Sequence, residues 1–314
     1  MIVPTMNPEE VNIVNYVGRG IHNEKFVESL KNGNLRQMLQ VINNDNDLDV
    51  QIRNDYINIY YRGGSIAKVQ SESSVEFDKY YFYLEMKNTP KNVIKLNPIV
   101  VAELKLQRNL LIDKFKKHEY KDYFNQAKRV MDKWLKINPK PERMEQHQLS
   151  VENKYNKSDY TIIDLEYQVS TESEFACTFI AKGKAVHKNP RFDIIAINKE
   201  GKLCVIELKK GTGALTNTSG LKEHWDCYQE SIGRNPNPFM TEMRKLLEQK
   251  QAFGLIDKQL KIDYPIPEFM FAYSYDDKTS DEKQDKVFRD ECNKIDIVIH
   301  VIRLAKGTLK LLDA

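Results

Sequence analysis

The chain has 314 residues, of which 41% are hydrophobic, and its 48 Lys and Arg against 45 Asp and Glu leave a net charge of only +3. This length allows one large or two ordinary domains, and no apolar run approaches the ~20 residues of a membrane span. A membrane protein is therefore excluded. We expect no secretory leader, and four widely spaced cysteines predict reduced thiols and a cytoplasmic location.

The first part of the chain predicts a mixture of helices and β-hairpins. Alternating apolar residues separated by turn residues predict strands between residues 48 and 87, and helices are expected near 24–42, 99–118 and 120–136. Two prolines at 139 and 141 then break the helical pattern. We therefore expect an N-terminal α+β domain with an antiparallel sheet over residues 1–138, a candidate for substrate recognition, and a second domain over 139–314.

The second part alternates between helical and extended patterns. A hairpin over 191–209 lies at its centre. The other expected helices and strands, in chain order, are a helix at 142–155, strands at 160–169 and 176–181, helices at 220–232 and 238–255, a strand at 268–275, a helix at 282–293 and strands at 295–304 and 308–312. Because most of the hairpin is apolar on both faces, it belongs in the middle of a sheet.

The hairpin brings acidic residues together. A three-residue loop ending in Gly201 predicts a register in which paired residue numbers sum to 400, so Asp193 lies opposite Glu207. Lys209, two residues beyond Glu207, points to the same face. Like charges placed opposite each other destabilise a sheet, and a hard divalent cation would make this pair tolerable.

The motif Asp193 with Glu207-Leu208-Lys209 resembles the PD-(D/E)XK nuclease superfamily, the restriction-endonuclease-like enzymes. The resemblance spans about 142–275, and Phe192 replaces the proline of the name-giving motif. It implies a mixed central sheet flanked by helices, and metal-dependent hydrolysis of phosphodiesters. Asp193, Glu207 and the Leu208 carbonyl would bind Mg²⁺ or Mn²⁺, while Lys209 would orient the attacking water.

Further candidates come from the neighbouring elements. The superfamily often adds an acid from the first helix, for which Glu145 is favoured, with Gln148 on the same helix face. An ordinary first-turn acid is the alternative for Glu145. Asp164 and Glu166 share one face of an otherwise apolar strand. Glu166 is an additional candidate, and a solvent-facing strand edge is an equally good interpretation. The histidines show no metal or nucleophile spacing and are interpreted as structural.

Basic residues suggest where a nucleic acid would bind. The loop before the hairpin holds four candidates, namely Lys182, Lys184, Lys188 and Arg191. A second cluster over 105–141 contains eleven Lys and Arg against four acids. Taken alone, it is better explained as the solvated side of two helices, and a phosphate-contacting surface becomes a competing interpretation beside a candidate phosphodiesterase site.

The sequence thus predicts an Mg²⁺- or Mn²⁺-dependent nuclease with nucleic acid, preferably DNA, as its partner. It predicts no nucleotide cofactor, and a homodimer is compatible with it. The alternative is a catalytically idle nuclease-fold module that binds nucleic acid or a protein.

Overall fold

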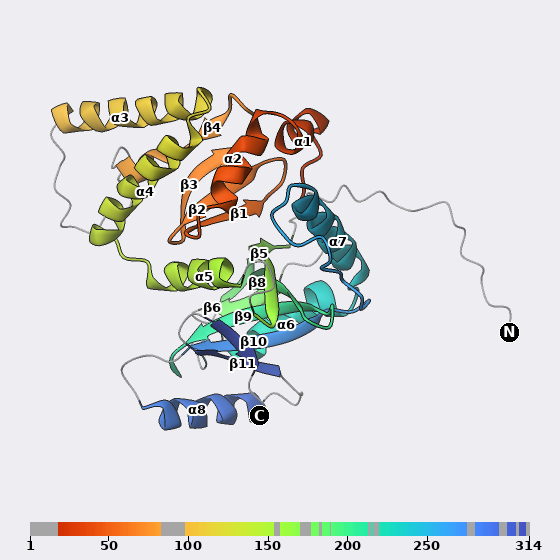
Figure 1. Ribbon diagram of the computed structural model, residues 1–314. Helices are drawn as coiled ribbons and strands as arrows, with labels where there is room; N and C mark the ends of the chain where they lie inside the picture. Colours follow the sequence, from red (N-terminus) through yellow and green to blue (C-terminus); the bar gives the residue numbers. More distant parts are fainter. Residues whose placement is uncertain are drawn as a thin grey trace.

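The computed structural model describes residues 18–82, 98–153, 158–169, 177–181, 184–188, 190–212, 215, 220–274, 280–294, 300–305 and 308–311. The helices are α1 (Glu24–Lys31), α2 (Asn34–Asn43), α3 (Pro98–Lys116), α4 (Tyr120–Ile137), α5 (Pro141–Glu152), α6 (Leu221–Tyr228), α7 (Asn237–Ala252) and α8 (Asp281–Asn293), with a 3₁₀ turn η1 (Lys79–Phe82) and a π-helical turn η3 (Gln229–Gly233). The fold is α+β, as predicted (Figure 1).

The N-terminal residues form an antiparallel sheet covered by helices. Its strands, in the order β1-β2-β3-β4, are β1 (Leu48–Ile52), β2 (Ile57–Tyr61), β3 (Gly64–Val69) and β4 (Val75–Glu76). The predicted strand over 76–87 is wrong where the structure describes it, because the chain leaves β4 and forms η1 with Phe82 buried. The helix predicted over 24–42 is divided at Gly33, which is the N-cap of α2.

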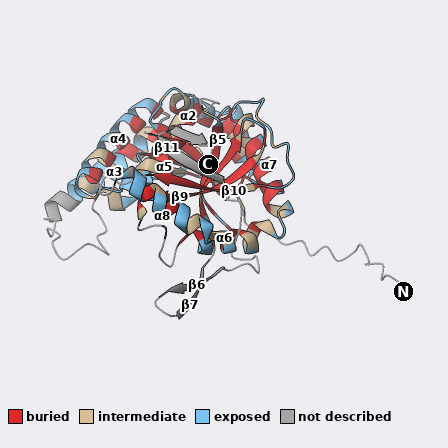
Figure 2. Ribbon diagram, turned by 90° about the horizontal axis from the view of Figure 1, so that it is seen from below, coloured by how far each residue is buried: buried red, intermediate tan, exposed pale blue. Residues whose placement is uncertain are grey.

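The C-terminal residues form a mixed sheet in the order β12-β11-β10-β9-β8-β5. The strands are β5 (Tyr160–Gln168), β8 (Arg191–Asn198), β9 (Leu203–Lys210), β10 (Glu268–Ser274), β11 (His300–Ala305) and β12 (Thr308–Leu311), and β6 (Cys177–Ala181) pairs with β7 (Lys184–Lys188) as a separate two-stranded sheet. β9, β10 and β11 are parallel, and the other neighbours are antiparallel. Buried strands at the centre of the molecule (Figure 2) match the apolar sequence of the hairpin.

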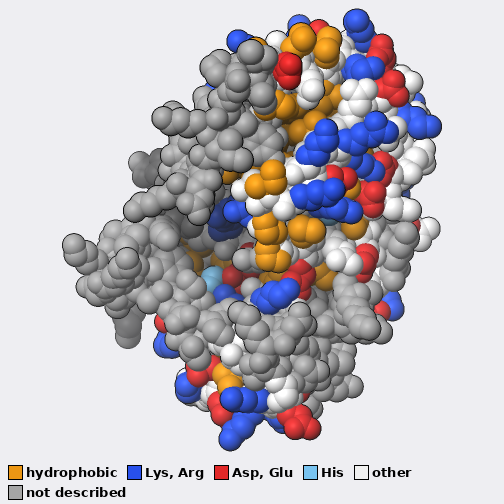
Figure 3. All heavy atoms as spheres, turned by 90° about the vertical axis from the view of Figure 1, so that its left-hand side faces the viewer, with side chains coloured by type: hydrophobic (Ala, Val, Ile, Leu, Met, Phe, Trp, Pro, Cys, Tyr) orange, Lys and Arg blue, Asp and Glu red, His pale blue; other side chains and the backbone are white. Residues whose placement is uncertain are grey.

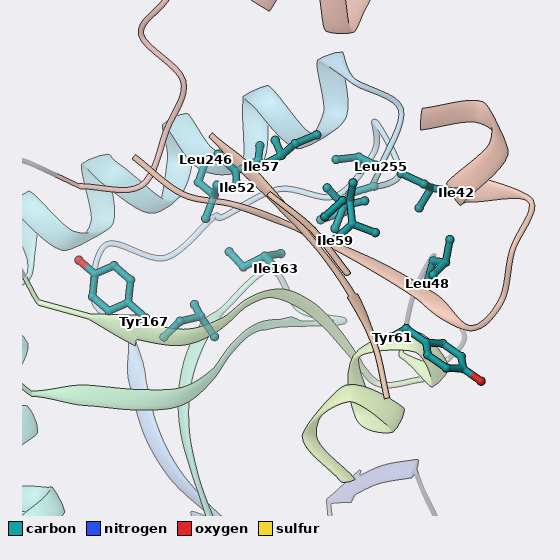
Figure 4. Packing of buried hydrophobic residues seen from close by; sticks show 14 of the residues in the cluster. Ile42, Leu48, Ile52, Ile57, Ile59, Tyr61, Ile163, Tyr167, Leu246 and Leu255 are labelled. Carbon is teal, nitrogen blue, oxygen red and sulfur yellow. The ribbon is translucent and has the colours of Figure 1, made fainter. Parts of the chain in front are cut away.

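The two parts are joined by a shared core. Helix α5 lies between the two sheets in Figure 1, and α7 packs against the N-terminal sheet. Figure 4 shows Leu246 of α7 beside Ile52 and Ile57, with Ile163 of β5 nearby, and all four belong to one hydrophobic cluster. Division of the chain near residue 138 remains a prediction, and residues from both sides of that boundary bury apolar surface together.

A buried ion-pair cluster also links the two parts. Asp164 of β5 is fully buried and binds Arg53 at 2.5 Å and Arg19 at 2.7 Å. Burial acts to raise the pKa of Asp164, but the two guanidinium groups outweigh it and hold the pKa below its ordinary value. The interpretation of Asp164 as a residue on a solvent-facing edge is therefore wrong.

One expectation about the cysteines needs correction. Cys227 on α6 is disulfide-bonded, whereas Cys204 and Cys292 are free thiols. Spacing along the chain does not show which cysteines the tertiary structure brings together. In the described part of the chain, no helix is long and apolar enough to cross a membrane.

Candidate active site

The β8–β9 hairpin has the predicted register. Ile194 pairs with Ile206, Ile197 pairs with Leu203, and the numbers of each pair sum to 400. The loop places Gly201 at φ +81°, in the left-handed region that glycine adopts without strain. The turn chemistry read from the sequence therefore determines which residues of the two strands meet.

The ladder between β8 and β9 ends at Ile194 and Ile206, one residue before the two acids. Beyond that point a side chain replaces the backbone as the hydrogen-bond acceptor: Asp193 Oδ2 accepts a hydrogen bond from the Leu208 amide at 2.9 Å. Asp193 and Glu207 are therefore not a ladder pair. The two strands separate at this point, and the Asp193 carboxylate lies between them.

The other edge of β8 is irregular near the same position. β5 pairs Leu165 with Ile194 and Tyr167 with Phe192, which brings Glu166 opposite Asp193, and the register of β5 shifts two residues before Glu166, between Ile162 and Asp164. Glu166 has φ +49°, which is uncommon for a residue with a side chain. Irregularities of this kind re-aim side chains at functional sites, and here they free Asp193 from the regular pleat.

Glu207 lies at the centre of the site and is only 4% exposed. Its Oε1 contacts Lys209 Nζ at 3.3 Å and His224 Nδ1 at 3.0 Å. Its Oε2 is buried and accepts no hydrogen bond from the described residues. A buried carboxylate oxygen without a partner is costly, so the site has an oxygen available for a ligand.

The electrostatics of the site show that the two carboxylates are near neighbours. Burial raises the pKa of Glu207 well above its ordinary value, the charge of Asp193 raises it further, and Lys209 acts in the opposite direction. A cation close to both carboxylates would remove this penalty, because an opposite charge favours the ionised form.

The first helix of the C-terminal part supplies a different residue from the one predicted. Gln146 of α5 is buried, and its Nε2 donates to Asp193 Oδ1 at 3.0 Å. Glu145 instead binds Lys210, the last residue of β9, at 2.6 Å. Gln148 is exposed and donates to Glu152 at 2.7 Å, away from Asp193.

This difference follows from which face of α5 is buried. The buried residues of α5 are Gln146, His147, Leu149 and Ser150, followed by Asn153 at its C-cap. The apolar residues Met144 and Val151 of the same helix are only partly buried. Polar residues on the inner side of a helix break the pattern by which sequence analysis finds a buried face.

The structure describes only some of the predicted nucleic-acid contacts. Lys182 lies outside the described residues, and Lys184 and Lys188 are placed on β7 by their backbone alone. Arg191 is exposed, and its guanidinium lies 3.5 Å from the carboxylate of Glu166.

Sequence reasoning missed His224 and Gln146. His224 was interpreted as structural because it has no metal-ligand spacing, yet the start of α6 brings its ring to Glu207. The only sequence signal was its position on the helix that follows the hairpin. The only sequence signal for Gln146 was its position on the predicted helix, next to the favoured candidate Glu145.

The residues present fit a hard divalent cation. Asp193 and Glu207 supply carboxylate oxygens, and Leu208, which follows Glu207, supplies a backbone carbonyl; such oxygen donors suit Mg²⁺ or Mn²⁺. The uncommitted Oε2 of Glu207 is the specific structural support for this fit. Within the described ranges no group of three or more His, Cys, Asp or Glu side chains is arranged to hold a metal, so water would complete the coordination.

No family model, no curated protein and no solved structure matches this chain.

Proposed function

We propose that the chain is a divalent-metal-dependent nuclease that hydrolyses phosphodiester bonds of nucleic acid, with DNA preferred over RNA. The observation that carries this proposal is the environment of Glu207. Its carboxylate is buried beside a second acid and a lysine, and one of its oxygens accepts no hydrogen bond from the described residues. Perturbed carboxylates of this kind cluster at functional sites.

Each side chain has a role that its position supports. Asp193, Glu207 and the Leu208 carbonyl would hold Mg²⁺ or Mn²⁺, which polarises a phosphoryl oxygen and lowers the pKa of water. Lys209, beside Glu207, positions the attacking water and stabilises the negative charge that develops on the phosphoryl oxygens. His224 contacts Oε1 of Glu207, and Oε2 would then be the oxygen that holds a bound cation.

The substrate enters past Asp193, which is partly exposed, whereas Glu207 and Lys209 are buried. Residues 1–138 contribute to substrate recognition in this proposal, because α5 and β5 contact the N-terminal sheet beside the site. We also propose that the protein acts in the cytoplasm.

Calorimetric titration with Mn²⁺ and a cleavage assay together test this function. Wild-type protein should bind the ion and cleave single- or double-stranded DNA or RNA only when it is present. Glu207→Gln should abolish both, and Lys209→Met should abolish cleavage. The control is Glu200→Gln, the same change at the exposed turn of the same hairpin. Nucleic-acid binding without Mn²⁺ binding or cleavage would instead indicate an idle nuclease-fold module.

A further inference from the structure

A small pocket lined by both polar and apolar groups lies where α5, β5 and the β2–β3 hairpin meet. Its volume is about 170 Å³, room for about six waters at ~30 Å³ each, which is the size of one heterocyclic base. Its walls include Tyr60, Tyr81, Arg143, Gln146 and Glu166. Strands from the N-terminal part and a helix and strand from the C-terminal part therefore build it together.

The pocket has a closely packed wall at the β2–β3 turn. Gly63 has φ +76°, and a Cβ there would lie 2.4 Å from the carbonyl oxygen of Arg143. The turn and the first turn of α5 are thus in direct contact. This close packing defines the position of the pocket relative to α5.

Gln146 connects the pocket to the candidate active site. Gln146 lines the pocket, and its Nε2 donates to Asp193 Oδ1 at 3.0 Å. Glu166, on the opposite wall, belongs to the irregular segment of β5 beside Asp193. Gln146 therefore contacts both the pocket and the carboxylate that would bind the metal.

The pocket contains a preorganised cation beside an aromatic ring. Arg53 donates to Asp164 at 2.5 Å and to the Leu165 carbonyl at 3.1 Å, and its guanidinium lies 5.9 Å from the centre of the Tyr60 ring. Because these contacts hold both groups in place, little side-chain freedom remains to be lost when a ligand binds.

The remaining groups favour a ligand with both donors and acceptors. Arg143 is exposed and makes no hydrogen bond or ion pair with the described residues, so it is a donor available to a ligand. Glu166 is an acceptor and would repel a phosphate. Aromatic faces together with donors and acceptors are the chemistry that recognises an unstacked nucleobase by stacking and by its hydrogen-bonding edge.

We propose that this pocket receives one unpaired nucleobase of the substrate strand, next to the phosphate that lies at Asp193. This inference rests on the proposed nuclease function and narrows its substrate class to strands with an unpaired base, such as single-stranded nucleic acid. A continuous duplex has all its bases stacked and must pay an unpairing cost before one of them enters the pocket.

Binding of short oligonucleotides in EDTA tests the pocket separately from catalysis. The probes are single strands of ~8 nucleotides, within the site sizes of single-strand-binding folds, each with one abasic position, compared with the intact strand and its duplex by fluorescence anisotropy. The intact strand should bind more tightly than the duplex. One abasic position should weaken binding about 5- to 150-fold, the range expected when one stacked base is lost.

Variants then assign this effect to the pocket. Arg143→Ala and Glu166→Gln should weaken binding of the intact strand and reduce the penalty at the abasic position. Arg36→Ala, which removes the same charge from an exposed site on α2, should leave the penalty unchanged. Equal affinity for all abasic strands, or no binding of any strand, would overturn the pocket assignment.

The two proposals fail in different ways. If the protein cleaves with metal but binds all abasic strands equally well, the nuclease proposal stands and the base pocket is rejected. A position-specific abasic penalty in a protein that neither binds Mn²⁺ nor cleaves would preserve the base pocket and reject the nuclease.

Discussion

Asp193 Oδ2 accepts a hydrogen bond from the backbone amide of Leu208 at 2.9 Å, where the β8–β9 ladder has already ended. The side chain thus satisfies a buried backbone donor that would otherwise be costly to leave unpaired. It also places the Asp193 carboxylate next to Leu208, whose carbonyl is proposed as a metal ligand. The site and the end of the sheet are therefore one structural unit, and changes at Asp193 affect both.

Replacing Glu207 should show separately how its carboxylate affects the stability of the fold and the binding of the metal. Burial and Asp193 penalise the ionised carboxylate, so Glu207→Gln in EDTA should have an unchanged or higher melting temperature. Excess Mn²⁺ should stabilise only the wild type, by about 2.7 kcal/mol at 100 times the dissociation constant. Thermal unfolding with and without Mn²⁺ measures both effects. A metal-free variant clearly less stable than wild type would show that the carboxylate is structural.

His224 should affect metal affinity more than stability. Its ring contacts Glu207 Oε1 at 3.0 Å, and loss of a group that orients a ligand typically weakens metal binding 10- to 100-fold. We expect His224→Ala to weaken Mn²⁺ binding by about this factor, measured by calorimetry. Lys222→Ala is the control, because Lys222 lies on the same helix and pairs with Asp226 at the surface. Unchanged affinity in His224→Ala would contradict the orienting role.

Asp164 should stabilise the fold in a pH-dependent way. Asp164→Asn leaves Arg19 and Arg53 without their carboxylate, and breaking a buried pair costs about 3–5 kcal/mol. Because the folded pKa of Asp164 lies below the ordinary value of 3.8, its contribution is present above about pH 4 and is lost as pH falls through the folded pKa. Urea unfolding from pH 7 to pH 3 should show the difference between wild type and variant shrinking only at the acidic end.

Salt dependence should show which basic surface contacts phosphates. The upper part of Figure 3, where α3 and α4 lie in Figure 1, carries many Lys and Arg side chains. Several of them are already paired within the protein; Lys128, for example, binds Asp45 and Asp47. Lys133 and Lys136 are exposed and make no hydrogen bond or ion pair with the described residues, which makes them a suitable comparison pair for the loop.

Replacing Lys182 and Lys184 with Gln should reduce the salt slope for duplex DNA by about 1.8, since each phosphate contact contributes roughly 0.9. The matched variant replaces Lys133 and Lys136. Binding isotherms at several salt concentrations measure the slopes. A reduced slope only in the matched variant would place the phosphate contacts on α4 instead. Arg191 is left intact because it lies beside Glu166.

Local sequence was sufficient for the hairpin and for most elements. Gly201 and its turn determine the β8–β9 register, because a two- or three-residue loop leaves few ways to pair the strands that it joins. The same local reasoning placed α3, α4, α5 and β10 close to their observed bounds. It was wrong for residues 77–82, the part of the predicted 76–87 strand beyond β4 that the structure describes, where packing of Phe82 against the N-terminal core overrides the strand propensity of the tyrosines.

Residues distant in sequence could be brought together only by the tertiary structure. The sequence by itself determined that Asp193, Glu207 and Lys209 would gather at one end of a buried hairpin, since strand alternation and turn length are local properties. It could not show that Gln146, rather than Glu145, reaches Asp193, that His224 contacts Glu207, or that Arg53 binds Asp164. Those contacts depend on how α5, α6 and the N-terminal sheet pack on β5 and β9, and packing is decided by the complementary shapes of whole elements.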